Sequence, residues 1–249
     1  MTQQIQAYLK RQLRKREEYL ESGPFSVGIT ASNDDPYCNY AVPAEGAQPT
    51  EAEVAELIQF FEAKARHPRL EYIPEWAPDV EPALLAAGFS VESRTPLMTC
   101  RKIDLEIPRE PAGVEVGIPT SERDLRHLML IVNEAFGSPP PETSDVLKLE
   151  RRIQKGIIVR QAFESGSKRI LGGGSCTDIV GGLTEIVGIG VSTESRGKGV
   201  GGYLTGKLAE AAFKAGANIC FLMAATSREA RIYQRCGFKR IGEVLHISK

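Results

Sequence analysis

Residues 184–206 read TEIVGIGVSTESRGKGVGGYLTG, and this stretch decides the fold. It opens with a nearly continuous β-branched apolar run, which is typical of a strand buried on both faces. After the glycines, helical spacing begins at Tyr203 and Leu204. The glycines are therefore expected at a strand-to-helix turn. Because backbone N–H groups and the positive end of a helix dipole converge at such a turn, the sequence predicts a phosphate-binding site.

Two common nucleotide-binding patterns fit this stretch poorly. Gly197, Gly199 and Gly202 satisfy G-x-G-x-x-G, but that dinucleotide fingerprint also needs an acidic residue about 20 positions on. Residues 217–227 contain no Asp or Glu, and the remaining chain is too short to complete such a domain. A Walker loop fails because no Ser or Thr follows Lys198 and Ser192 stands where its first glycine belongs. A nicotinamide-dependent oxidoreductase is kept as the alternative enzyme class.

The pattern that fits is Arg196-x-x-Gly199-x-Gly201. It resembles the coenzyme A loop of the Gcn5-related N-acetyltransferases, the GNAT superfamily, whose pattern is Gln/Arg-x-x-Gly-x-Gly/Ala. Residues 185–191, EIVGIGV, resemble the fourth strand of that family. Residues 230–238, ARIYQRCGF, resemble its second signature, A-x-x-x-Y-x-x-x-G-F. The resemblance covers residues 113–249, with both motifs in the family's order.

The resemblance implies acetyl-CoA as cosubstrate and a defined set of residues that bind it. Loop backbone N–H groups would hold the pyrophosphate, and glycine is required where a Cβ would keep the anion away. The backbone of the fourth strand would pair with the pantetheine arm, and Gly188 and Gly190 suit a bulge there. The alternative is a tight turn without a ligand. The expected cofactor-binding residues are Ile189, Val191, Arg196, Gly197, Lys198, Gly199, Val200 and Gly201.

Acetyl transfer to an amine requires a base for the amine, whose pKa is about 10, and a proton donor for the thiolate, whose conjugate acid has a pKa of about 8.5. By resemblance, Tyr233 is the expected general acid; otherwise it is a core tyrosine. Glu185 corresponds to the family's common general base, and a charge in an apolar strand is costly unless used or paired. A structural salt bridge is the alternative for Glu185. Ser227 departs from the asparagine of many members, which weakens that contact.

Composition excludes several other classes of protein. The 249 residues carry 31 basic and 32 acidic side chains, a net charge of -1, so a nucleic-acid groove binder is not expected. No apolar run has membrane-spanning length, and no membrane partner is expected. The three histidines are scattered, so no metal site is expected. Five dispersed cysteines suit buried thiols in a cytoplasmic protein.

The first half predicts an alternation of helices and strands. Residues 2–21 are expected to form one helix, and residues 50–66 another, with Thr50 and Glu53 as a capping box. The basic run of residues 10–16 is either a binding patch or a solvated helix face. The glutamates that follow at once favour the solvated face.

The two halves are expected to be related. Aligning Gly88-Phe89 with Gly237-Phe238 gives strand, helix, strand, helix, Gly-Phe, strand in both. Residues 107–113 contain two prolines and a glycine and are taken as the boundary. The expected fold class is α/β (α+β) with two GNAT-like domains, each a mixed central sheet flanked by helices. Residues 1–110 are expected to be a degenerate copy without the glycine cradle, and residues 113–249 the catalytic domain.

These patterns favour an acetyl-CoA-dependent N-acetyltransferase. The expected acceptor is a primary amine of a small molecule or amino acid, and a non-catalytic acyl-CoA sensor is the remaining alternative.

Overall fold

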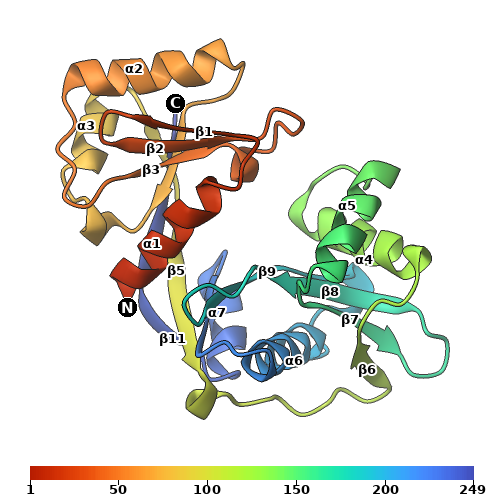
Figure 1. Ribbon diagram of the computed structural model, residues 1–249. Coiled ribbons are helices and arrows are strands. Elements are labelled where there is room, and N and C mark those ends of the chain that lie inside the picture. Colours follow the sequence, from red (N-terminus) through yellow and green to blue (C-terminus); the bar gives the residue numbers. More distant parts are fainter. The chain divides into compact units, whose positions relative to one another are not determined.

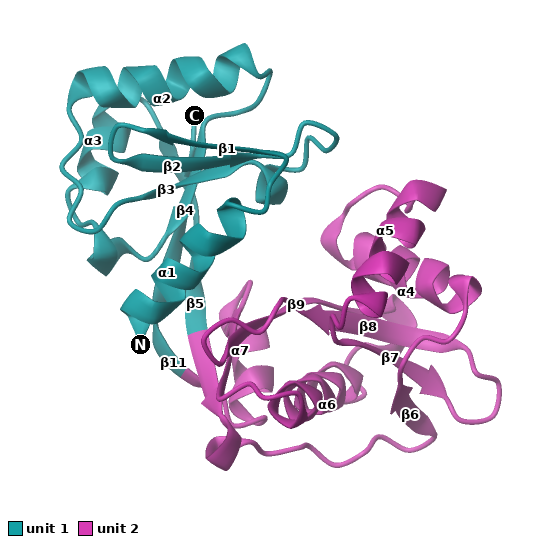
Figure 2. Ribbon diagram, viewed as in Figure 1, with its two compact units in different colours: residues 1–97, 240–249 teal, residues 98–239 magenta.

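The computed structural model describes all 249 residues and divides into two compact units (Figure 2). Unit 1 comprises residues 1–97 and 240–249, and unit 2 comprises residues 98–239. None of the helices combines the length and apolar character needed to cross a bilayer. All five cysteines are free thiols, and four of them are buried.

Unit 1 is a mixed sheet with helices on both faces (Figure 1). The strand order is β1-β2-β3-β4-β11-β5. β3 and β4 are parallel, whereas β2 runs antiparallel to β3 and β11 antiparallel to β4. The elements are α1 (Thr2–Leu13), β1 (Glu18–Ser22), β2 (Phe25–Ile29), β3 (Tyr40–Pro43), α2 (Glu51–Ala63), β4 (Arg69–Tyr72), α3 (Val80–Ala86), β5 (Ser90–Arg101) and β11 (Lys239–Ser248), with short 3-10 turns at Pro36–Cys38 and Pro74–Trp76.

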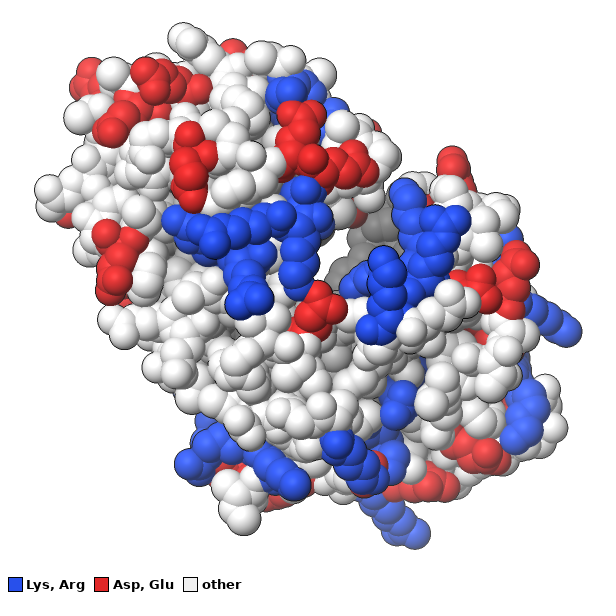
Figure 3. Space-filling view, in the orientation of Figure 1, with Lys and Arg blue, Asp and Glu red and all other residues white.

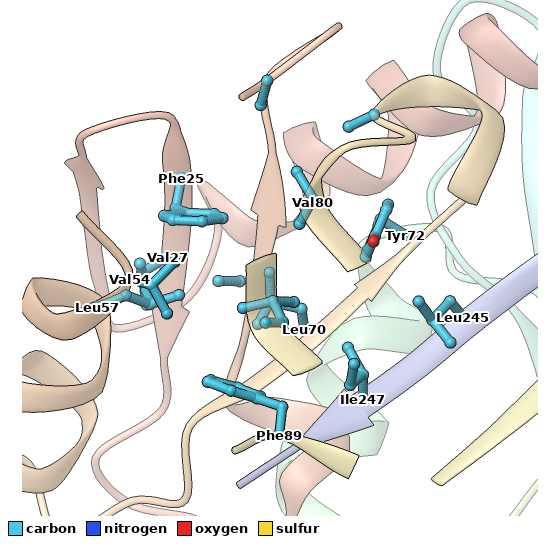
Figure 4. Packing of buried hydrophobic residues seen from close by; sticks show 14 of the residues in the cluster. Phe25, Val27, Val54, Leu57, Leu70, Tyr72, Val80, Phe89, Leu245 and Ile247 are labelled. Carbon is cyan, nitrogen blue, oxygen red and sulfur yellow. The ribbon is translucent and has the colours of Figure 1, made fainter. Parts of the chain in front are cut away.

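Alternating strand residues build the core of unit 1. Phe25 and Val27 of β2, Leu70 of β4 and Ile247 of β11 face the apolar sides of α2 and α3 (Figure 4). Residues at the intervening positions, such as Val42, face α1, where Leu13 is fully buried. Because successive side chains of a strand point to opposite faces of the sheet, these strands bury one face under α2 and α3 and the other under α1.

Unit 2 has the same architecture. Its strand order is β5-β10-β9-β8-β7-β6, with β9 and β10 parallel and the other pairs from β6 to β9 antiparallel. The elements are β6 (Val114–Gly117), α4 (Glu122–Phe136), α5 (Thr143–Gln154), β7 (Val159–Glu164), β8 (Ile170–Cys176), β9 (Leu183–Val191), α6 (Val200–Lys214), β10 (Ile219–Met223) and α7 (Ser227–Gln234), with 3-10 turns at Lys102–Asp104 and Thr193–Ser195.

The predicted internal repeat is visible in the element order. β3-α2-β4-α3-β5 in the first half corresponds to β9-α6-β10-α7-β11 in the second. Gly88 and Gly237, the glycines of the two Gly-Phe pairs, both have φ of +87°. The two final strands are exchanged, however. In the unit 1 sheet β4 is followed by β11, and in the unit 2 sheet β10 is followed by β5.

This exchange changes the domain division from the expected one. The division expected at residues 110–113 follows the prolines, but the contacts divide the chain at Leu97–Met98 and Lys239–Arg240. Residues 98–101 and the segment through residue 113 belong to unit 2, whereas the last ten residues belong to unit 1. Composition marks an irregular segment, and it does not reveal which sheet a strand joins.

One local prediction was wrong. The helix expected over residues 2–21 ends at Leu13, and Glu18–Ser22 forms β1, because Tyr19 and the following residues pair with β2. The capping box of Thr50 and Glu53 is confirmed at the start of α2.

Candidate functional site

β9 and β10 separate part-way along their length. Their parallel pairing runs from Leu183 opposite Ile219 to Glu185 opposite Phe221. β9 then continues to Val191 while paired only with β8. The backbone of residues 186–191 thus has no β10 partner. A forked pair of strands offers unpaired N–H and C=O groups that an extended ligand can pair with.

A bulge re-aims the backbone of β9 within this fork. Ser175 of β8 lies opposite Val187, and Gly173 lies opposite Gly190. Between these pairs β9 has two residues where β8 has one. Gly188 has φ of +63°, a conformation that favours glycine. The expected bulge is therefore present, and it removes β9 backbone groups from the ladder.

Helix α4 lies directly over the bulge. A Cβ on Gly190 would be 2.7 Å from the Cα of Val132, and one on Gly173 would be 2.4 Å from Cγ of Leu128. These glycines are therefore required by close packing of helix on sheet. Sequence reasoning missed Leu128 and Val132 as part of the site wall. The signal that could have found them was the run of three glycines at 172–174 inside a strand.

The glycine loop lies between the end of β9 and the start of α6. Gly197 and Gly199 have φ of +77° and +84°, and Gly199 is the residue before the first turn of α6. Residues 196–199 are exposed, and a Cβ on Gly197 would meet no atom within 4 Å. The Arg196 Nε donates a hydrogen bond to the carbonyl oxygen of Val191 at 3.1 Å. The first N–H groups of α6 therefore face an unobstructed surface.

The segment before β6 covers the flank of α6. A Cβ on Gly202 would lie 3.7 Å from Cγ of Pro108, and one on Gly206 would lie 3.2 Å from its Cδ. The Tyr203 hydroxyl donates a hydrogen bond to Glu110 at 2.8 Å. The proline-rich segment is thus a packed part of unit 2 that secures the first turns of α6.

Helix α7 packs against the same end of α6. The Cys236 thiol donates to the carbonyl oxygen of Gly202 at 3.3 Å, and Ile232 lies close to the Gly202 Cα. Tyr233 of α7 is half-buried beside Phe238, with ring centroids 6.4 Å apart. Its hydroxyl makes no hydrogen bond within the protein, and burial, followed by the nearby Glu229 and Cys236, raises the pKa of Tyr233 to about 12. The phenol is therefore a protonated donor across the neutral range.

Glu185 lies where β9 and β10 part. Its main chain is held by Thr177, whose hydroxyl accepts from the Glu185 N–H at 2.9 Å and whose own N–H donates to the Glu185 carbonyl at 2.8 Å. The residue is half-buried. A carboxylate thus stands at the start of the fork, on a backbone fixed from both sides.

The other predicted residues fall on the same strand–loop–helix segment. Ile189 and Val191 are half-buried on β9, and Lys198 is exposed in the loop. The Val200 side chain is buried against Val114, Ala162 and Leu171, so only its main chain can face a ligand. Ser227 is the first residue of α7, and the cap is made by Thr226, whose hydroxyl accepts from the N–H groups of residues 228 and 229.

Comparison with known proteins agrees with this geometry. Residues 125–238 match the family model described as "Acetyltransferase (GNAT) family". These residues form a GNAT domain. No curated protein sequence matches the chain.

Solved structures resemble the chain beyond the GNAT domain. A GCN5-related N-acetyltransferase from Kribbella flavida is 23% identical over 100% of this chain and 95% of its own, with a TM-score of 0.82. One from Sphaerobacter thermophilus is 19% identical over 91% and 76%, with a TM-score of 0.68. A tandem GNAT protein from the clavulanic acid biosynthesis pathway is 14% identical over 85% and 77%, with a TM-score of 0.61. At these identities the likeness shows the fold.

Proposed function

We propose that the GNAT domain transfers an acetyl group from acetyl-CoA to a primary amine of a small molecule or amino acid. The observation that carries the proposal is the combination of the β9–β10 fork, the bulge at Gly188 and the open glycine loop on one continuous segment. An extended arm would pair with β9 while its diphosphate end reaches the N-terminus of α6.

The loop residues suit a diphosphate. Main-chain N–H groups from Arg196 to Gly201 would bind its oxygens, and the open space beside Gly197 admits the anion. The exposed side chains of Arg196 and Lys198 add positive charge. Ile189 and Val191 would bind the pantetheine arm through their backbone.

The chemistry assigns one proton step to each titratable residue. Glu185 would take a proton from the ammonium form of the acceptor, directly or through water, so that the free amine attacks the thioester carbonyl carbon. A C–N bond forms as the C–S bond breaks, the second proton of the attacking nitrogen is lost to solvent, and the thiolate is released as the thiol by taking up a proton. N–H groups freed at the bulge would stabilise the oxyanion. Tyr233 would donate to the departing sulfur. Because its pKa is about 12, above that of a thiol, its main contribution is a hydrogen bond to the developing thiolate.

Unit 1 is proposed to be a degenerate copy that does not bind coenzyme A. At the position equivalent to the glycine loop it has the segment between β3 and α2, which contains one glycine, Gly46. Titration of the whole protein with acetyl-CoA should give one site per chain. Two sites would disprove this part of the proposal.

The experiment that tests the function is a turnover screen of amines, amino acids and peptides with acetyl-CoA, followed by free thiol release. Acetyl-CoA should also raise the thermal transition, since a ligand at 100 times its Kd adds about 2.7 kcal/mol, whereas NAD should not. A transition that responds to NAD alone would favour the oxidoreductase. Tight acetyl-CoA binding with no thiol release for any acceptor would favour a sensor.

A further inference from the structure

Unit 1 contains a cavity of about 730 Å³ that the proposed reaction does not use. It lies between α1, the end of β3 and the turn at Pro74–Trp76. Its size is within the range of small-molecule sites. The lining residues are Gln6, Ala7, Lys10, Arg11, Arg14, Lys15, Val42, Pro43, Ala44, Glu45 and Trp76.

The charge of this cavity is strongly one-sided. Four basic residues line it, all from α1 and the turn after it, against one acidic residue, Glu45. Lysine and arginine side chains gather over this part of α1 at the surface (Figure 3). Lys10 is paired with Glu21 at 3.5 Å, and Arg14 lies over the ring of Tyr19. Arg11 has neither an acidic partner nor a hydrogen bond.

Simple helix electrostatics explains only part of this arrangement. Cations near a helix C-terminus interact favourably with the dipole, which accounts for basic residues in the last turn of α1. Arg14 and Lys15 follow Leu13, the last residue of α1, and line the same cavity as Lys10 and Arg11 of the helix. Arg11 thus stands out among the four, because it lines the cavity without a partner from the protein.

One buried residue of the cavity lining, Gln6, has a hydrogen-bond donor without an acceptor. Gln6 is 1% exposed, and its Oε1 accepts from the N–H of Ile73 at 2.8 Å. Its Nε2 has no hydrogen-bond partner. A buried amide N–H₂ that is left unpaired is costly. The Nε2 atom itself is enclosed by protein, so Gln6 contributes a polar side chain to the cavity wall and no direct contact with a ligand.

The opposite wall is apolar. Val42, Pro43 and Ala44 line it together with Trp76, whose indole N–H donates to the carbonyl oxygen of Pro43 at 3.2 Å. The cavity is thus larger than an inorganic anion requires, and it combines several cations with an apolar and aromatic surface. Multiple cations match the two or more charges of a phosphoryl group better than the single charge of a carboxylate.

We infer that this cavity binds an organic phosphate, with the phosphoryl group against Arg11 and Arg14 and the apolar or planar part against Trp76. The site is independent of the acetyl-transfer proposal, since every residue that forms it belongs to unit 1. The sequence favoured a solvated helix face for the basic run of residues 10–16. The inference instead makes part of that run a ligand-binding surface.

The test uses Trp76, the sole tryptophan of the chain, as a fluorescence reporter in the full-length protein. Phenyl phosphate is the probe, with inorganic phosphate and phenol as matched halves of it. Phenyl phosphate should change the emission saturably in the millimolar range, bind more tightly than either half, and weaken as salt is added.

Variants locate the site. Arg11→Gln and Arg14→Gln should each raise the apparent Kd of phenyl phosphate about tenfold or more, as expected for a lost charge-assisted contact. Lys64→Gln, which removes an exposed cation of unit 1 outside the cavity, is the control and should leave the Kd unchanged. Circular dichroism would verify that each variant folds.

Three results would overturn the inference. These are no saturable response to phenyl phosphate, binding that Arg11→Gln and Arg14→Gln leave unchanged in folded protein, or binding of phenol as tight as that of phenyl phosphate. Failure of the amine screen would not affect this test, because its readout does not depend on turnover.

Discussion

At the scale of single residues, the surroundings of Tyr233 determine the protonation state of its phenol. Burial beside Phe238 raises its pKa, and its hydroxyl is left without a partner inside the protein. Tyr233 is only half-buried, so its hydroxyl can donate to solvent or to a ligand. The proton-donor role of Tyr233 stays a prediction, with a packing role as its alternative.

Replacement of Tyr233 by phenylalanine should lower kcat about 100-fold, because one hydrogen-bond donor to a developing negative charge is worth about that much. The Kd for acetyl-CoA should not change, since the ring is retained. Wild-type activity should also show no alkaline loss from this group below about pH 11, because its acid form persists until the pH nears its pKa of about 12. Stopped assays across pH with both proteins would check this, and unchanged turnover in Tyr233→Phe would remove the assigned role.

A second residue-scale feature is a buried ion cluster in unit 1. Arg69 is 1% exposed, and its guanidinium contacts Glu71 and Glu92 at 3.1 Å each and His246 at 2.9 Å. Burial alone would raise the pKa of Glu71, but contacts with His246 and Arg69 outweigh it and hold that pKa below its ordinary value. The charged form of Glu71 is thus tied to the folded state.

Glu71→Gln should lower the free energy of unfolding by about 3 kcal/mol at neutral pH, because it leaves a buried guanidinium short of charge. Because the pKa of Glu71 is lowered in the folded protein, its ionised carboxylate stabilises the fold at pH values above the ordinary carboxyl pKa. That stabilisation is lost as the pH falls from the ordinary pKa through the lowered one. The wild-type and variant stabilities should therefore converge in acid. Glu92→Gln, at the partly exposed partner, is the matched control and should cost about 1 kcal/mol or less. Urea titrations at several pH values would measure both, and a constant difference at all pH values would contradict the argument.

At the scale of elements, the two Gly-Phe pairs occupy equivalent positions. Each lies between the end of a helix and the start of a strand, α3 and β5 in one case and α7 and β11 in the other. Gly88 and Gly237 share a φ of +87°, but their surroundings differ. A Cβ on Gly88 would approach only the end of Lys249, at 3.7 Å, whereas one on Gly237 would lie 1.8 Å from the carbonyl oxygen of Asp104. The conformation is common to both halves, and the close approach belongs to unit 2.

This pair separates backbone strain from steric conflict. Gly88→Ala should destabilise the protein by about 1 kcal/mol, the cost of a positive φ in a residue with a Cβ. Gly237→Ala should cost about 3 kcal/mol or more, since the Asp104 segment must also move. Thermal unfolding of the two variants would measure the difference. Equal losses would mean that the segment at Asp104 yields easily.

The elements also show what sequence could predict. The glycine loop, the bulge at Gly188 and the capped helix α2 depend on local residues, and each was found at its predicted place. The end of α1 was missed because residues 14–22 carry no strong helix breaker before Gly23, and pairing with β2 decides their state. The wall formed by Val132 was missed because it depends on which helix covers Gly190, a non-local contact.

At the scale of the whole molecule, each unit contains residues from both halves of the chain, because the final strands β5 and β11 are exchanged. β5 and β11 each contribute residues to both units, so no single cut in the chain separates one complete sheet from the other. This arrangement explains why the proline-rich segment at 107–113 is a poor place to divide the protein.

A chain that ends at Lys239 should lose the core of unit 1. Leu245 and Ile247 are fully buried there, and their removal exposes the neighbouring apolar residues of β4. Hydrogen exchange should then show loss of protection across β4, while β7, β8 and β9 of unit 2 keep theirs. A chain that ends at Ser248 serves as control. Retained protection in β4 of the shorter chain would show that β11 is dispensable.

The position of β11 in the unit 1 sheet also determines when that sheet can be completed during translation. An N-terminal domain ordinarily folds while the rest of the chain is still being made. In this protein, the unit that begins at residue 1 takes one of its inner strands from residues 240–249. Its sheet cannot close until residues 240–249 have been translated and have left the ribosome. The first half to be synthesised is thus the last to be finished, and its exposed β4 edge must be kept from other chains throughout translation.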